Sequence, residues 1–378
     1  MWTLIALFIV CTIFAYFIET TEDERTWKSL IFACFAIMAL VGGTRLIGGS
    51  DFGIYDSHYD NLATFPDVLD PENRNLKYET GYTYIAAFFK TLGVSFYGFC
   101  LIADIFFYIG VYIGLRKYTR HFGLIILVLL YKLFFYDTMI SMRQSITIAC
   151  FFIMVPWITQ RKWIRYYIAC LLVATIHNGA YLLFLIYPIT YLKFSKNLII
   201  LLNIIFIPTT VIGLAGIDVI GPLGEFLKDN AINDNMELKS EKYFGNGGAT
   251  DFESGLGIFH TLEYFLLMLI LVMNVSKFHL SDKRVQTAIG MFMCLLPLFT
   301  LFRGSEILTR QKDYFTLFYA VILGYTINVN YNYRRLIYVA TTLLCAFGYY
   351  RFMILFDGGA MLKYESWLFN PDYNFFLY

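Results

Sequence analysis

Apolar runs recur along the whole of this chain, and they constrain its fold more than any other feature. Twelve runs approach the roughly 20 residues that a helix needs to cross a bilayer, at 2–18, 29–47, 95–115, 122–136, 142–158, 165–177, 179–192, 198–216, 257–275, 286–302, 314–330 and 336–353. Only 15% of the 378 residues are charged, against about 25% in an ordinary soluble domain. The sequence therefore predicts an all-α, polytopic membrane protein with about twelve spans in a single integral domain, 1–378.

Basic residues in the short linkers between these runs predict the orientation. Of the 29 Lys and Arg, 15 lie in linkers that alternate onto one face, which the positive-inside rule places in the cytoplasm. The long segments 48–80 and 221–256, together with both termini, then lie outside. The short runs 165–177 and 179–192 predict either two crossings or one re-entrant pair. The first run lacks a basic leader and an A-x-A site, which indicates a retained helix.

One helical pattern is too short to cross the membrane. The stretch from Glu79 to about Leu92 has a helical spacing of apolar residues, but counting it as a span would place Arg116–Arg120 outside, against the charge rule. We therefore expect an amphipathic helix on the outer interface. The region 48–94 is predicted to be an outer loop plus this interfacial helix, and 221–256 a second outer loop that is either a lid or a plain connector.

Charge and cysteine content exclude two classes of protein. The net charge is +1 and the Lys and Arg are scattered, whereas nucleic-acid binding needs a concentrated basic surface. All seven cysteines lie in apolar runs with no C-x-x-C pair and no Cys/His cluster at metal spacing. We expect no nucleic-acid partner and no metal site, and we interpret the cysteines as small packing residues.

Charges inside the apolar runs are informative, and four of them are weighed together: Asp104, Lys132, Arg143 and Glu263. Each costs about 2.5–3.5 kcal/mol at the middle of a bilayer, so together they would cost roughly 10 kcal/mol if unpaired. Asp104 and Lys132 lie on adjacent antiparallel spans about one turn apart in depth. The sequence predicts a structural ion pair between them, with a catalytic role as the alternative, and leaves Glu263 open.

A second polar set collects at the outer ends of the runs. Its members come from six separate segments, and a helical bundle would bring them together just beneath the outer surface: Arg45, Asp51, Tyr55, Glu79, Tyr82, Arg143, Gln144, His177, Arg303, Arg310 and Tyr314. Each has an ordinary explanation alone, since arginines at helix ends extend to headgroups and tyrosines form interfacial belts. Their common depth predicts a site, in which the tyrosines offer stacking surfaces for sugars.

Short elements within this set resemble the EpsG family of O-antigen-polymerase-like (Wzy-type) proteins. G-G-T-R-L-I-G-G-S-D-F-G-I-Y, from Gly42 to Tyr55, is similar to that family's R-x-x-x-G-x-D-x-x-x-Y element. Y-E-T-G-Y, S-M-R-Q-S-I, R-K-W-I-R-Y-Y followed by I-H-N-G-A, and R-Q-K-D-Y-F resemble its later elements, in the family's order. Around His177, Ile176 and Asn178 depart from the usual aromatic and hydroxyl residues.

The resemblance implies a C-type, metal-independent, inverting glycosyltransferase without a cofactor. It would transfer a growing glycan from polyprenyl diphosphate to a hydroxyl of a lipid-linked acceptor, at the outer face of the bacterial cytoplasmic (inner) membrane. The implied partners are a polyprenyl-diphosphate-linked oligosaccharide, the lipid bilayer, a chain-length regulator and a flippase.

This chemistry assigns roles to the outer residues. Arginine suits phosphate oxygens because its planar fork binds them bidentately, and Arg45, Arg143 and Arg310 are the candidates. The acceptor hydroxyl needs a base, for which Asp51, Glu79 and His177 remain open. Substrate contacts are assigned to Tyr55, Tyr82, Gln144, Arg303 and Tyr314.

Two other functions remain as alternatives. A membrane O-acyltransferase would use His177 as its base. A lipid-linked-sugar flippase or other transporter is disfavoured because the charges lie mostly at one face and no internal repeat is present.

Overall fold

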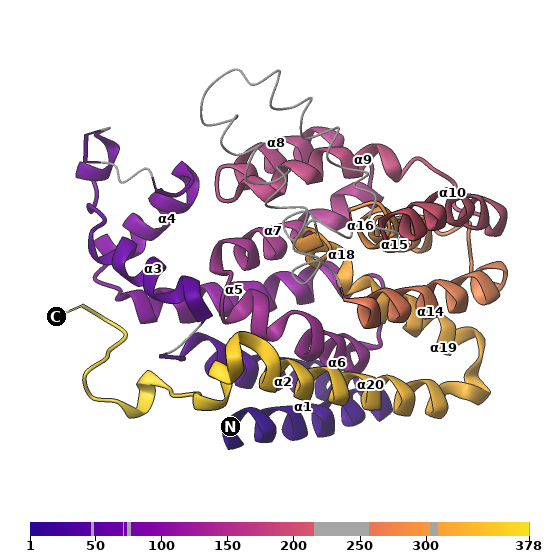
Figure 1. Ribbon diagram of the computed structural model, residues 1–378, viewed down its shortest axis with the longest axis horizontal. Helices are drawn as coiled ribbons and strands as arrows, with labels where there is room; N and C mark the ends of the chain where they lie inside the picture. Colours follow the sequence, from indigo (N-terminus) through magenta and orange to yellow (C-terminus); the bar gives the residue numbers. More distant parts are fainter. Residues whose placement is uncertain (47–48, 71, 74–76, 215–256, 303–308, 378) are drawn as a thin grey trace. The chain divides into compact units, whose positions relative to one another are not determined.

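The computed structural model describes residues 1–46, 49–70, 72–73, 77–214, 257–302 and 309–377, and in this part of the chain the regular structure is helical throughout (Figure 1). The only β pairing recorded among these residues consists of two isolated bridges, Arg45 with Ser366 and Val94 with Phe376. The chain divides into two compact units. The first comprises Met1–Tyr187 and Asn330–Tyr378, and the second Pro188–Val329. The all-α prediction is confirmed for the described residues.

The first unit contains most of the long helices. They are α1 (Trp2–Thr20), α2 (Glu24–Gly43), α3 (Gly49–Asp60), α4 (Thr80–Thr91), α5 (Phe96–Leu115), α6 (Phe122–Lys132), α7 (Met142–Thr159), α8 (Trp163–Ala174) and α20 (Arg334–Leu355). Side-chain caps begin two of them: Asp23 accepts a hydrogen bond from Thr26 N at 2.7 Å, and Ser95 Oγ accepts one from Gly98 N at 3.1 Å.

Helices α5 and α7 form the tightest helix pair of this unit, because glycines let their backbones approach. A Cβ atom added to Gly110 would lie 2.7 Å from the carbonyl oxygen of Ala149, and one added to Gly114 would lie still closer to the carbonyl oxygen of Phe152. Small residues four apart permit such contacts between membrane helices. This packing fixes α7, which carries Arg143 in its first turn, against α5.

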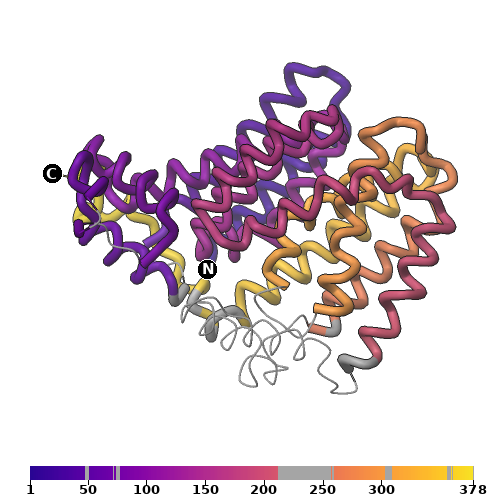
Figure 2. The backbone as a smooth tube through the Cα atoms, turned by 90° about the horizontal axis from the view of Figure 1, so that it is seen from above, coloured from indigo at the N-terminus to yellow at the C-terminus, as the bar shows by residue number. Residues whose placement is uncertain are grey.

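The carboxyl-terminal tail ties two segments of the first unit together. Its backbone bonds Thr44 and Leu46 at the end of α2, through Trp367 N and Glu365 O, and then Ser95 at the start of α5, through Phe375 O. Figure 2 shows this yellow tail beside the purple α3–α4 region. The tail therefore braces the ends of α2 and α5, between which α3 and α4 lie in the chain.

The second unit contains α10 (Lys196–Leu214), α14 (Ile258–Asn274), α15 (Lys283–Met293), α16 (Leu295–Phe299), α18 (Asp313–Thr316) and α19 (Phe318–Val329). Tyr264 of α14 stacks on Phe299 of α16, with ring centroids 4.7 Å apart. The side chain of Gln286 bonds both the backbone N–H and the carbonyl of Phe194, at 2.8 and 3.2 Å. These contacts hold α14, α15 and α16 together with the segment that precedes α10.

Six helices among the described residues are long and apolar enough to cross a membrane, and all six coincide with predicted runs. They are Trp2–Thr20, Glu24–Gly43, Phe96–Leu115, Met142–Thr159, Phe259–Lys277 and Tyr331–Leu355. The count of twelve stays a prediction. Two further apolar helices, Trp163–Ala174 and Asn178–Ile189, have 12 residues each and are about 20 Å long, shorter than the roughly 30 Å hydrocarbon core. Their length favours the re-entrant alternative for 165–192.

Candidate functional site

Arg143 and Glu79 form the centre of the candidate site. Glu79 is the N-cap residue of α4, and Arg143 lies in the first turn of α7. Arg143 Nη1 contacts Glu79 Oε2 as an ion pair, and Arg143 Nε donates to the hydroxyl of Tyr55 at 3.1 Å. The guanidinium carbon also lies 4.3 Å from the centre of the Tyr78 ring. Residues of three segments that were predicted to meet are therefore in contact, and their place at the outer surface stays a prediction.

The second oxygen of the Glu79 carboxylate faces the end of α8. Oε1 accepts a hydrogen bond from the backbone N–H of Asn178 at 3.1 Å, and His177 Nδ1 lies 3.6 Å from the same atom. The start of α4 approaches this segment closely, because Gly81 N donates to the carbonyl of Thr175 at 2.8 Å. A guanidinium, an imidazole and a backbone N–H thus converge on one carboxylate.

This environment changes the acidity of Glu79. Burial opposes ionisation, but the His177 imidazole, the Arg143 charge and the Asn178 N–H outweigh it and lower the pKa of Glu79 from 4.5 to about 2. Glu79 is consequently an anion at physiological pH. It is a weak base for as long as its three partners hold it.

Aromatic rings surround the site on the α3–α4 side. Tyr55 stacks on Tyr78 with ring centroids 5.1 Å apart, and Tyr82 meets both rings edge-on at 6.0 and 5.6 Å. His58, one helical turn after Tyr55 on α3, meets Tyr78 edge-on at 4.6 Å. Burial raises the pKa of Tyr78 to about 12, so its hydroxyl stays protonated at physiological pH. We call these four residues the aromatic box.

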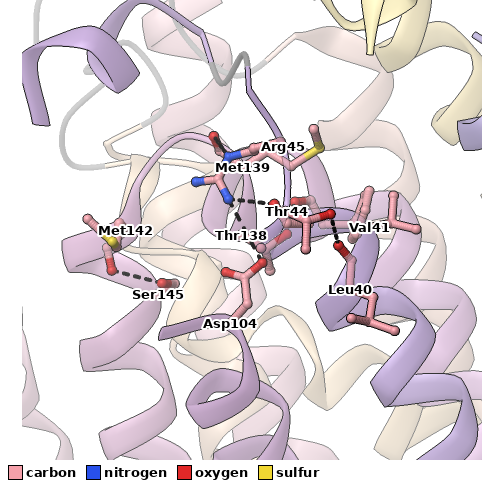
Figure 3. A network of polar contacts seen from close by, with 12 residues as sticks. Leu40, Val41, Thr44, Arg45, Asp104, Thr138, Met139, Met142 and Ser145 are labelled. Carbon is pink, nitrogen blue, oxygen red and sulfur yellow. Dashed lines mark hydrogen bonds and ion pairs between the residues drawn. The ribbon is translucent and has the colours of Figure 1, made fainter. Parts of the chain in front are cut away.

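Arg45 lies in a separate polar network deeper in the first unit (Figure 3). Its Nε donates to the carbonyl of Met139 at 2.7 Å and its Nη1 to that of Gly42 at 2.6 Å. Only 2% of the residue is exposed, and Nη1 lies 4.0 Å from Asp104 Oδ2. Two backbone carbonyls and one carboxylate of the first unit thus surround the Arg45 guanidinium.

The prediction that Asp104 pairs with Lys132 is therefore wrong, because the cation beside Asp104 is Arg45. Position along a span predicts depth but not which face of the helix a side chain occupies. Arg45 reaches Asp104 because Gly42, one turn earlier, has no side chain in the way: a Cβ there would lie 2.5 Å from Asp104 Oδ2.

The other predicted residues divide between the two units. In the first, Tyr55 and Tyr82 belong to the aromatic box, and Gln144, the residue after Arg143, is buried. Burial raises the pKa of Tyr55, and the nearby charge of Asp51 adds to this effect. In the second, Tyr314 is fully buried on α18, Arg310 is half-buried, and the carboxylate of Glu263 lies 3.7 Å from His260. Arg303 and the loop 221–256 lie outside the described residues.

Sequence reasoning missed two features of the site. The segment containing Asp51 and His58 was predicted to be loop, but it forms helix α3, which presents Tyr55 and His58 to Tyr78 one turn apart. The contact of the Asn178 backbone N–H with Glu79 could not be predicted, because every residue except proline has such a group. A helical spacing of Tyr55, His58 and Tyr59 was the available signal for α3.

The part of the chain that the structure describes holds no group of three or more His, Cys, Asp or Glu side chains that could bind a metal ion. The site is built from one arginine, one carboxylate, one imidazole and aromatic rings. Such a set suits an anionic ligand that carries a neutral, ring-shaped group.

A model of the EpsG family matches residues 28–366, a range that includes Glu79, Arg143 and His177. No curated protein and no solved structure shows a significant match to this sequence.

Proposed function

Because this chain belongs to the EpsG family of Wzy-like polymerases, we propose that it extends a bacterial surface polysaccharide from lipid-linked repeat units. The donor is a glycan on polyprenyl diphosphate, and the acceptor is a hydroxyl of a second lipid-linked unit. The reaction takes place at the outer face of the cytoplasmic membrane. The observation that carries the proposal is the convergence of Arg143, His177 and the Asn178 N–H on one anion, in a protein with several membrane-spanning helices.

These three donors form the diphosphate site. Arg143 offers a planar fork held by the Tyr55 hydroxyl, and a guanidinium fixed in this way matches phosphate oxygens. In the protein without substrate, the carboxylate of Glu79 occupies the position of the phosphate oxygens. An incoming diphosphate takes over the three donors and displaces Glu79.

Displacement of Glu79 prepares it to act as a base. Its pKa of about 2 reflects His177, Arg143 and Asn178, so the pKa rises once these donors bind the diphosphate and a second anion lies nearby. Binding of the donor substrate thereby creates the base that the acceptor needs. Among Asp51, Glu79 and His177, we therefore assign proton transfer to Glu79.

The chemical step is a single displacement with inversion at the anomeric carbon. The acceptor hydroxyl oxygen forms a bond to that carbon, its proton passes to the Glu79 carboxylate, and the bond to the diphosphate breaks with the electron pair remaining on the phosphate oxygen. Arg143 and His177 stabilise the charge that develops on this leaving group. A diphosphate is a stable anion, so it needs neutralisation more than protonation.

Arg45 supports the site from a distance in this scheme. It binds the carbonyl of Met139, three residues before the start of α7. Through this contact Arg45 fixes the segment that enters α7, and so the position of Arg143.

Substitution of Arg143 tests the proposal. Purified protein in vesicles receives lipid-linked repeat units, and products are resolved by chain length. We expect R143A to lower elongation at least 100-fold, as loss of one preorganised donor does in acyl transfer. The matched control is R116A. Arg116 also lies over a tyrosine ring, that of Tyr112, at 5.4 Å, but it is the C-cap residue of α5 and does not belong to the candidate site. Elongation by R143A at the wild-type rate would contradict the proposal.

The same vesicles distinguish the alternatives. An O-acyltransferase would add acyl groups without lengthening the glycan. A flippase would move the repeat unit across the membrane, and placing that unit on one face only makes such movement visible.

A further inference from the structure

The imidazole of His58 is buried without any hydrogen bond. The residue is 3% exposed, and neither Nδ1 nor Nε2 has a partner among the described residues. Burial, with the charges of Lys77, Arg143 and Lys90, lowers the pKa of His58 to about 4. The ring is therefore neutral at physiological pH and carries one N–H donor and one acceptor, both unused.

An unused donor and acceptor are costly in a protein interior. Each unsatisfied buried group carries a desolvation cost that no hydrogen bond offsets, and such groups in native structures call for an explanation. Phenylalanine also carries an aromatic ring, although a larger one, and has no polar atom to leave unsatisfied. The free nitrogens of His58 therefore point to a ligand that supplies the missing hydrogen bonds.

The walls around His58 define what that ligand is. They are the rings of Tyr78 and Tyr82, whose centroids lie 4.6 and 6.3 Å from that of His58. Apolar aromatic walls with one or two polar groups are typical of sites for neutral, ring-shaped molecules. A sugar combines such apolar ring faces with hydroxyl groups that both donate and accept hydrogen bonds.

The box adjoins the anion site through a single ring. Tyr78 contacts both His58, at 4.6 Å, and the Arg143 guanidinium, at 4.3 Å. Tyr78 is half-buried, whereas Tyr55 and Tyr82 are almost fully buried. Tyr78 is thus the wall that is free to move without disrupting the core of the box.

We propose that the aromatic box is the subsite for the sugar bonded directly to the diphosphate, and that His58 binds a hydroxyl of this sugar. The proposal rests on the diphosphate site at Arg143. When Arg143 holds the diphosphate, the first sugar of the donor lies beside it, at the position that Tyr78 occupies in the free protein. Tyr78 moves aside, and the sugar hydroxyl satisfies the nitrogens of His58.

Binding measurements test the subsite separately from the reaction. Two probes are used: the lipid-linked repeat unit extracted from cells that lack this protein, and polyprenyl diphosphate without a sugar. We expect wild-type protein to prefer the first probe about tenfold, close to the value of one or two hydrogen bonds to a neutral group. H58F should abolish this preference and leave the affinity for bare polyprenyl diphosphate unchanged, whereas H58Q, which retains a donor and an acceptor, should restore part of it.

Stability supplies a second readout. H58F removes unsatisfied groups, so the free protein should unfold at the same or a higher temperature, whereas a structural histidine would lower that temperature. The matched control is Y59F on the same helix, because the Tyr59 hydroxyl already donates to Val94 O at 2.8 Å. Y59F should lower the unfolding temperature and keep the sugar preference.

The outcomes separate the two levels of the proposal. If H58F keeps the tenfold preference, or if it lowers the unfolding temperature as Y59F does, the sugar subsite is wrong while the diphosphate site stands. If R143A binds bare polyprenyl diphosphate as well as wild type does, the diphosphate site itself is wrong.

Discussion

His177 Nδ1 lies 3.6 Å from Oε1 of Glu79, on the carboxylate oxygen that Arg143 does not contact. Arg143 and His177 therefore lie at opposite oxygens of one carboxylate. The Asn178 N–H donates to the oxygen that His177 faces. This arrangement explains how one cluster can serve both to bind a diphosphate and to withhold a base until the diphosphate arrives.

The exchange of Glu79 for substrate predicts opposite effects of E79Q on binding and on turnover. A neutral amide competes less well for Arg143, so the affinity for polyprenyl diphosphate should rise several-fold. Elongation should fall by at least 100-fold because the base is lost. Equilibrium binding to vesicle-embedded protein and chain-length analysis of the products measure the two effects. Normal elongation by E79Q would remove Glu79 as the base and return the role to Asp51 or His177.

Glu79 also predicts a specific acid sensitivity. Its folded-state pKa is about 2, below the ordinary 4.5, so its ionised form contributes stability that is fully present above about pH 4.5 and is lost as the pH falls toward 2. E79Q cannot lose this contribution. The gap in unfolding temperature between wild type and E79Q, measured from pH 6 to pH 3 in detergent, should narrow as the pH falls. A constant gap would show that the carboxylate is not held by its partners.

The meeting of Arg143, Glu79 and His177 was predictable from the sequence, whereas their contacts with other residues were only partly so. Arg143, Glu79 and His177 begin or end apolar segments, and the rule that charges avoid the bilayer centre brings such positions to one level. The helix from Glu79 to about Leu92 was likewise predictable and is found as Thr80–Thr91. Whether this helix lies on the membrane interface stays a prediction.

The position of a residue along a span does not say which way its side chain points around the helix. Asp104 and Lys132 are predicted to lie at similar depth, yet Asp104 faces Arg45 because a glycine opens that side of α2. No sequence pattern singles out His58, because the feature that distinguishes it is two ring nitrogens without hydrogen-bond partners in the folded protein. Breaks within the predicted runs, such as that between α15 and α16, also follow from packing and not from hydropathy.

Gly81 allows the start of α4 to approach the end of α8 closely. A Cβ at this position would lie 2.8 Å from the carbonyl carbon and oxygen of Thr175. We expect G81A to cost about 1–3 kcal/mol in stability and to lower elongation, because it separates Glu79 from His177. The matched control is G53A on α3, where a Cβ meets nothing within 4 Å, so better helix propensity should stabilise the protein by up to about 1 kcal/mol. Denaturant unfolding and elongation assays of both variants check this, and equal behaviour of the two would contradict it.

Arg45 and Asp104 allow a structural role to be separated from a role in binding. R45M leaves the Asp104 carboxylate buried without its cation, which should cost about 3–5 kcal/mol. D104N should cost less, because Arg45 keeps its bonds to Gly42 and Met139. The double variant R45M/D104N removes both charges and should recover much of the stability lost by R45M, as measured by denaturant unfolding. If Arg45 only positions α7, elongation should recover together with stability. Recovery of stability without elongation would show instead that Arg45 binds the diphosphate, and a cost for R45M no greater than for D104N would show that the pair contributes nothing.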